Sequence, residues 1–173
     1  ADLSEAHYGA ALLNDCKYGY KVKDGIIDLA LLRSPKFPDF DADQGYHEFT
    51  YSFLPHTGSL AKSTVQSEAA ALNRAPLIFA GYSAENVTPV CRLEAEGLSL
   101  EVVKKAEKED CLVVRIVETK GENSHGTLVL REKDAKFYET NLIEWEEGTE
   151  QDSQDGRYQL SLMPFEIKTY KIR

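Results

Sequence analysis

The sequence predicts an all-β protein made of antiparallel β-sandwich domains, with one short helix. Short runs of β-forming residues recur along the chain and are separated by turn residues, as in β-sandwiches. Only one segment has apolar residues at helical spacing, and no apolar run approaches the roughly 20 residues that a membrane helix needs. The 173 residues are 42% hydrophobic and 28% charged, which is typical of a soluble globular protein. We therefore expect no membrane partner.

The charge and the cysteines narrow the class of protein further. The formal net charge of −9 disfavours nucleic-acid binding, because phosphate contacts need clustered Lys and Arg. The 3 cysteines include no C-x-x-C pair and fit neither a disulfide framework nor a thiol zinc site, so we expect them to be reduced and mostly buried. The chain opens at Ala1 without an initiator Met or a signal-peptide pattern, which indicates a piece of a longer protein.

Strands are expected first along the chain. The apolar run Ala10 to Leu13 predicts a short strand, and two β-rich runs within residues 20–32 flank Asp24-Gly25, a strong signal for a hairpin turn. Residues Arg33 to Gly45 hold two prolines and three acids without any period. This composition predicts a long surface loop, of the kind that often carries function.

A further strand and the helix follow. Residues 47–53 alternate, with His47 and three aromatic residues on one face, which predicts a half-buried strand. Residues 63–73 predict the helix, with Ser63 or Thr64 as its N-cap. The segment after the helix mixes Pro, Gly, Asn and Ser, and we expect a domain boundary there. The resulting domains are residues 1–80 and 81–173.

The second domain is expected to be an antiparallel sandwich, because strand follows strand at short spacing. The charged run from Lys104 to Asp110 is interpreted as a solvated hairpin tip between two of these strands. The predicted strands are Leu98–Val103, Cys111–Glu118, Thr127–Leu130, Phe137–Ile143, Tyr158–Leu162 and Phe165–Ile172.

The densest group of potential metal ligands lies in and just after the long loop, at Asp39, Asp41, Asp43 and His47. The D-x-D-x-D string resembles a calcium loop, but Gln44 and Thr50 stand where Gly and a bidentate Glu are needed. A zinc site from Asp43 and His47 would lack further ligands. We favour an interpretation without metal, in which the acids accept hydrogen bonds from turn amides and the His47 ring bonds within the core.

Other patterns give weaker signals. The 4 histidines show no nucleophile elbow, and the 29 acids are too many for the sequence to single out a glycosidase pair. Asn86-Val87-Thr88 is a formal glycosylation sequon that we attribute to chance. Four aromatic residues could form a sugar-stacking surface, but aromatic residues in strands are more often core, and we assign these to it: Phe137, Tyr138, Trp145 and Tyr158.

Several long strings carry the interpretation further. They are Ala1–Glu5, Tyr8-Gly9, Ala11–Tyr20, Leu31–Pro35, Ala42–Tyr51, Leu54–His56, Glu139–Glu144 and Leu162–Tyr170. In this order they resemble the C-terminal region of the glycoside hydrolase family 38 α-mannosidases, over nearly the whole chain, and they point to the bacterial or cytosolic branch. Tyr46 departs from the pattern, because we expect Glu there.

The resemblance implies the C-terminal accessory part of a retaining exo-α-mannosidase that cleaves terminal α-mannosides. Its Asp nucleophile and its divalent metal, usually zinc, would lie in an N-terminal α/β barrel that this chain lacks. We therefore expect the chain alone to be inactive, to bind no metal, and to have the barrel as its partner in a cytoplasmic protein. The fold implied is the tail of a galactose mutarotase-like supersandwich followed by a small C-terminal sandwich.

The resemblance also implies that a loop of this β region reaches the rim of the sugar site. Arg33 is our candidate for an arginine that completes the site, and Asp43 and His47 are candidates for positioning the loop against the barrel. Two alternatives stay open at this point. The chain could be a free carbohydrate-binding module, or a purely structural domain that forms homo-oligomers.

Overall fold

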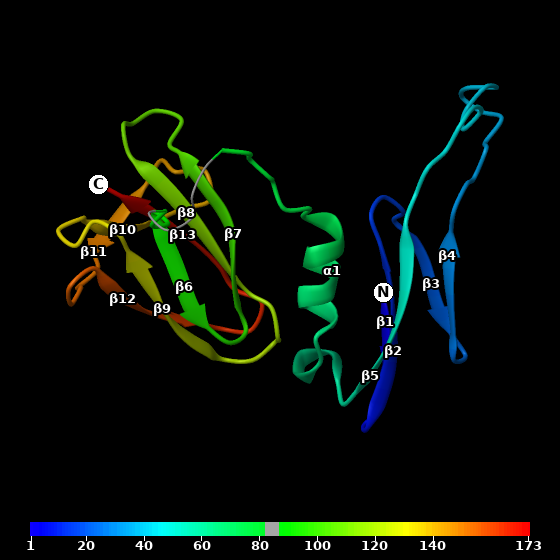
Figure 1. Ribbon diagram of the computed structural model, residues 1–173, viewed down its shortest axis with the longest axis horizontal. Helices are drawn as coiled ribbons and strands as arrows, with labels where there is room; N and C mark the ends of the chain where they lie inside the picture. The colour runs from blue at the N-terminus through cyan, green and yellow to red at the C-terminus, as the bar shows by residue number, and fades with distance from the viewer. Residues whose placement is uncertain (82–86) are drawn as a thin grey trace. The chain divides into compact units, whose positions relative to one another are not determined.

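The computed structural model describes residues 1–81 and 87–173 and consists mostly of antiparallel strands with one short α-helix (Figure 1). The all-β prediction is therefore confirmed. The chain divides into two compact units, unit 1 (residues 1–80) and unit 2 (residues 81–173). Each unit is described by itself.

Unit 1 is built on a three-stranded antiparallel sheet in the order β1-β2-β5, formed by Asp2–Ser4, Tyr8–Asn14 and Tyr51–Thr57. Residues along β2 alternate between the two faces, as the period of a strand requires. After a 3₁₀ turn at Leu60–Lys62, helix α1 (Val65–Asn73) lies against one face of this sheet. The small core between them consists of Ala11, Leu13 and Val65, with Leu54, Ala69 and Leu72 packed around it.

A separate two-stranded hairpin pairs β3 (Gly19–Lys23) with β4 (Ile26–Ala30). Its two turn residues, Asp24 and Gly25, both have positive φ angles, of 54° and 75°. This is the backbone of a type I′ turn, whose twist matches that of the flanking strands. The hairpin predicted from Asp-Gly is therefore confirmed.

A buried pair of side chains spans the sheet of unit 1. The Nε2 atom of His56 on β5 lies 2.7 Å from Oδ1 of Asp2 on β1, and both side chains are almost fully buried. The contact passes over Gly9 of the middle strand, where an added Cβ would lie only 2.6 Å from the imidazole ring. Glycine is thus the residue that lets the two outer strands be joined directly.

Unit 2 is a sandwich of two antiparallel sheets, a five-stranded one in the order β11-β10-β13-β8-β7 and a three-stranded one in the order β12-β9-β6. Eleven buried residues from Leu98 to Ile172 form one core cluster in this unit, with Phe137 stacked on Tyr170 at a centroid distance of 4.3 Å. The strands are β6 (Cys91–Ala95), β7 (Leu98–Lys105), β8 (Leu112–Glu118), β9 (Ser124–Leu130), β10 (Phe137–Thr140), β11 (Glu147–Glu150), β12 (Arg157–Leu162) and β13 (Ile167–Ile172).

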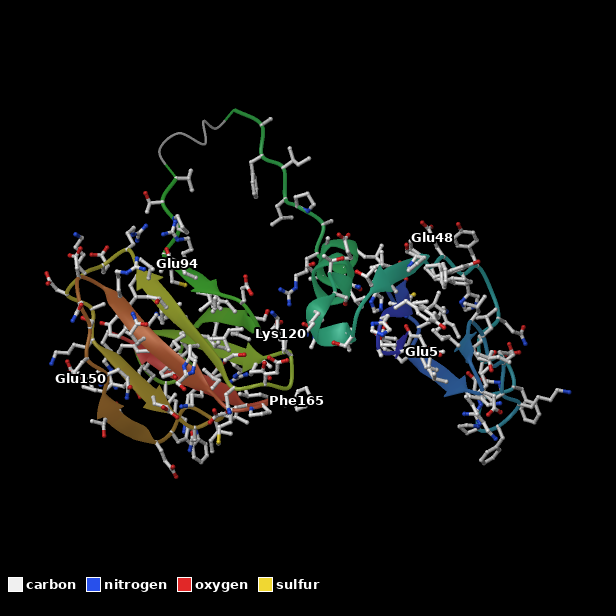
Figure 2. All side chains as sticks on the ribbon, turned by 90° about the horizontal axis from the view of Figure 1, so that it is seen from below. Glu5, Glu48, Glu94, Lys120, Glu150 and Phe165 are labelled. Atoms are coloured by element: carbon white, nitrogen blue, oxygen red, sulfur yellow. The ribbon has the colours of Figure 1, made fainter. Side chains whose placement is uncertain are left out.

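A buried carboxylate joins two turns at one end of the unit 2 sandwich. Glu118 is fully buried and accepts hydrogen bonds from the backbone N–H groups of Lys120, Gly121 and Phe165 and from the Ser124 hydroxyl, at 2.8–3.0 Å. Burial alone would raise the pKa of Glu118, but these donors outweigh it and lower the pKa from 4.5 to about 2. Figure 2 shows Lys120 and Phe165 at this end of the unit.

The strand predicted at residues 47–53 is wrong in its bounds, because β5 begins at Tyr51 and runs to Thr57. Tyr51 pairs with Asn14, the last residue of β2, and the carboxylate of Asp15 then accepts the N–H of Thr50 at 3.0 Å. The Asp15 side chain thus ends the backbone pairing of β2 with β5 before residue 49. The facing is also reversed: Phe53 is exposed, and the Leu54 side of the strand packs on the core.

The remaining elements were predicted with smaller errors. The helix is confirmed, with Thr64 at the N-cap position but without a capping hydrogen bond from its side chain. The tip between β7 and β8 carries most of the charged run, whose first two lysines lie in β7. Strand β10 stops at Thr140, earlier than predicted, and β1, β6 and β11 were not predicted. Phe137 and Tyr158 belong to the core as expected, whereas Tyr138 is only partly buried and Trp145 is exposed. Cys16 is exposed among the three free cysteines. The sequon begins at Asn86, outside the described residues.

Candidate functional site

The candidate site is the long connection between the end of β4 and the start of β5, which Figure 1 shows projecting past both strand ends. Nearly all of its side chains are exposed. A cis peptide bond precedes Pro38, and the φ angles of Ser34 and Asp43 are positive. We call residues 33–47 the rim loop. Its position and exposure agree with the predicted surface loop.

Asp43 closes the base of the rim loop. Its Oδ2 atom accepts the backbone N–H of Ser34 at 2.8 Å and that of Arg33 at 3.3 Å. These two amides, that of Ser34 first, hold the pKa of the Asp43 carboxyl below its usual value. The contact joins the two arms of the loop, so the loop has a defined base even though it lies on the surface. Acids accepting hydrogen bonds from backbone amides were predicted, and Asp39 does the same for the N–H of Asp41 at 2.9 Å.

His47 also contacts the base of the rim loop. Its Nε2 atom lies 2.8 Å from the backbone oxygen of Asp43, so that the ring contacts the main chain and not the carboxylate. The prediction of a strand histidine bonded within the core is wrong, because the residue precedes β5 and is only partly buried. Within residues 1–81 and 87–173, no group of three or more His, Cys, Asp or Glu side chains could hold a metal ion.

Arg33 lies at the start of the rim loop with its side chain exposed. Its backbone N–H is held by Asp43, whereas its guanidinium has no hydrogen bond or ion pair within the described parts of the chain. The structure thus links the three predicted site residues: the Asp43 carboxylate accepts the Arg33 backbone N–H, and the His47 ring contacts the backbone oxygen of Asp43. The Arg33 guanidinium itself is left available for an outside acceptor.

The sequence interpretation missed three aromatic residues of the rim loop. Phe37, Phe40 and Tyr46 are 84%, 77% and 88% exposed. Their signal in the sequence was a set of aromatic residues inside a polar, proline-containing loop without strand alternation. Their exposure means that the loop offers apolar rings as well as a guanidinium.

No helix among the described residues is long and apolar enough to cross a membrane.

The fold defines the chain as a β-sandwich protein with an ordered surface loop, and two family models then match it. Residues 1–41 match the glycosyl hydrolases family 38 C-terminal domain, and residues 97–170 match the glycosyl hydrolases family 38 C-terminal β-sandwich domain. The first match lies within unit 1, and the second lies within unit 2. The chain belongs to glycosyl hydrolase family 38 and corresponds to C-terminal domains of that family.

Three longer proteins are similar to nearly the whole chain or a large part of it. The chain is 37% identical to alpha-mannosidase G of Dictyostelium discoideum, with 99% of the chain and 16% of that protein aligned. It is 35% identical to mouse alpha-mannosidase 2C1, with 97% of the chain and 17% of that protein aligned. The human alpha-mannosidase 2C1 is 43% identical over 69% of the chain and 12% of its own length. The chain therefore spans about a sixth of the length of the first two relatives. That the chain comes from the bacterial branch of the family stays a prediction.

Proposed function

We propose that this chain is the C-terminal accessory region of a retaining, metal-dependent exo-α-mannosidase that hydrolyses terminal α-mannosides. The observation that carries the proposal is the match of both family models, together with relatives named alpha-mannosidase over nearly the whole chain. The nucleophile and the divalent metal, zinc by expectation, belong in this proposal to an N-terminal catalytic domain of the same cytoplasmic polypeptide.

An exposed apolar sheet face supports an accessory role for unit 1. Helix α1 covers only one face of the β1-β2-β5 sheet. On the other face Leu29 and Leu31 lie near Leu12 and Tyr51, but Tyr8, Tyr51 and Phe53 remain more than half exposed. A contiguous apolar face of this kind is unusual on the surface of a protein that works alone. We infer that another part of the longer protein covers it.

The rim loop supports a contact with the sugar site. Arg33 has a free guanidinium next to a backbone that Asp43 holds in place. A planar guanidinium donates two parallel hydrogen bonds, and it therefore suits a pair of sugar hydroxyls or a carboxylate of the catalytic domain. In this proposal Arg33 binds and orients, Asp43 and His47 keep its backbone in position, and the chemistry of bond cleavage takes place on the catalytic domain.

The proposal is tested by comparing the full-length protein with the 173-residue chain on an aryl α-mannoside, with and without added zinc or cobalt. We expect hydrolysis with retention of anomeric configuration by the full-length protein, inhibition by a chelator, and no hydrolysis by the chain alone. Metal-dependent hydrolysis by the pure chain would contradict the accessory role. An inactive full-length protein would contradict the assignment of the reaction.

A mutation of Arg33 tests the rim contact. In the full-length protein Arg33→Ala is expected to lower kcat/KM by roughly tenfold or more, since one charged hydrogen-bonding contact contributes about 1.5–3 kcal/mol. Arg33→Lys should restore little, because a point charge does not reproduce the planar fork. The melting temperature should stay unchanged, since the exposed guanidinium holds nothing in the fold. A lower melting temperature with unchanged kcat/KM would make Arg33 a structural residue.

A further inference from the structure

A polar pocket lies on unit 1, where strand β5 leads into helix α1 (Figure 1). Its volume is about 510 Å³, which is within the range of small-ligand sites in proteins. A lysine, a histidine and three residues with hydroxyl side chains line the pocket, and no acidic residue does. We name this the turn pocket, and its lining residues are Pro55, His56, Thr57, Lys62, Ser63 and Thr64.

Lys62 gives the turn pocket a full positive charge. Its side chain is exposed, and its ammonium group makes no ion pair or hydrogen bond within the described parts of the chain. The chain as a whole has a formal net charge of −9, so a pocket lined by a cation and by no carboxylate is opposite in sign to the molecule that carries it. The charge of Lys62 is therefore available to an anion.

The His56 side of the turn pocket is fixed from inside unit 1. The imidazole is only 5% exposed, and its Nε2 atom lies 2.7 Å from Oδ1 of Asp2. The hydroxyl of Ser4 donates to the other oxygen of Asp2, so that both carboxylate oxygens already have partners. Asp2 does not line the pocket. A ligand in the pocket therefore meets a buried, immobile imidazole ring and not the carboxylate behind it.

The turn before α1 holds the other side of the turn pocket. The N–H of Lys62 donates to the backbone oxygen of Ser59 at 3.0 Å. The backbone oxygen of Leu60 accepts the N–H and the hydroxyl of Ser63, at 3.1 and 2.8 Å. Thr64 makes no capping hydrogen bond from its side chain. Because this backbone is fixed in advance, a ligand loses little free energy in ordering it, and the Thr64 hydroxyl is left to donate to that ligand.

We propose that the turn pocket binds an oxyanion of the phosphate type, either as the free ion or as the phosphate group of a small organic molecule. Such an anion offers several acceptor oxygens to an ammonium group and to hydroxyl donors, and lysine binds phosphate as a point charge. A divalent cation is disfavoured by the charge of Lys62 and by the absence of any group of metal ligands among the described residues. The turn pocket lies outside the rim loop, so the proposal does not depend on the proposed function.

Phosphorus NMR of inorganic phosphate tests the pocket in the full-length protein. The line width of the phosphate signal is followed as protein is added at constant ionic strength, since salt screens exposed charges. We expect the signal to broaden, and Lys62→Gln should weaken the apparent affinity by about threefold or more, because the pocket loses its full charge. Lys62→Arg keeps the charge and should retain most of the affinity. Lys21→Gln is the matched control, because Lys21 is an exposed lysine of unit 1 that does not line the pocket.

A hexose phosphate and the same hexose without phosphate complete the test. Tighter binding of the hexose phosphate than of inorganic phosphate would support an organic phosphate as the ligand, and equal binding would support the free ion. The proposal is overturned if phosphate does not broaden, if Lys62→Gln and Lys21→Gln change the affinity equally, or if the unphosphorylated hexose binds as tightly as its phosphate. None of these readouts uses catalysis, so an inactive full-length protein would contradict the proposed function alone.

Discussion

Glu118 is the residue on which one end of the unit 2 sandwich depends. Three backbone amides and one hydroxyl donate to its carboxylate. Glu118→Gln keeps the shape of the side chain, but it replaces one acceptor oxygen by an NH₂ group that cannot accept hydrogen bonds from these donors. We expect it to lower the free energy of unfolding by about 2 kcal/mol, the order found when a charged buried acceptor is lost. Denaturant unfolding followed by fluorescence measures this, with the exposed Glu122→Gln as control.

The same carboxylate predicts a dependence on pH. The pKa of Glu118 is about 2 in the folded protein, below the usual 4.5 that the unfolded chain should show. Its contribution to stability is therefore complete at pH values well above 4.5 and is lost as the pH falls from there towards 2. Since Gln does not titrate, the difference in melting temperature between the native protein and Glu118→Gln should be constant above pH 6 and shrink below pH 4.5. A difference that stays constant down to pH 3 would count against this account.

At the scale of elements, the rim loop provides a test of its Asp43 base. Asp43→Ala removes the acceptor for the amides of Ser34 and Arg33, and we expect both amides to exchange their hydrogens at least tenfold faster. Asp43→Asn keeps an amide oxygen in the same place and should restore most of the protection. Glu48→Ala is the matched control, because Glu48 lies just after the loop and its carboxylate accepts the Tyr46 hydroxyl and not the amide of Ser34 or Arg33. Equal exchange in all three variants would show that Asp43 does not hold the loop.

The elements also show what the sequence could and could not predict. The β3–β4 hairpin and helix α1 were predicted because their signals, Asp24-Gly25 and the apolar spacing of residues 65–72, are local. Strand β5 was misplaced because its start depends on Asp15, a residue 35 positions away that takes the N–H of Thr50. The rim loop was predicted from its composition, but the Asp43 contact was not, because it joins residues nine and ten positions apart across an irregular backbone.

At the scale of the whole molecule, the two units differ in how much core each one has. The core cluster of unit 1 has three buried residues, whereas the main cluster of unit 2 has eleven. We therefore expect amides in β8, β9 and β13 to exchange far more slowly than those in β1, β2 and β5 when the 173-residue chain is studied by hydrogen exchange. In the full-length protein the difference in amide exchange rate between the two units should become smaller, because in the proposed function another part of the protein covers the open sheet face of unit 1. Equal protection in the isolated chain would contradict this.

The pair formed by Asp2 and His56 has a practical consequence for preparing this protein. Asp2 is the first residue of β1, yet its partner His56 lies 54 positions further along the chain. The pair fits because Gly9, between them, has no side chain. An expression version that starts after Ser4 would remove what looks like a dispensable tail. It would leave His56 buried without its acceptor and expose the edge of β2 to other chains. Recombinant versions of this protein should therefore keep residues 1–4.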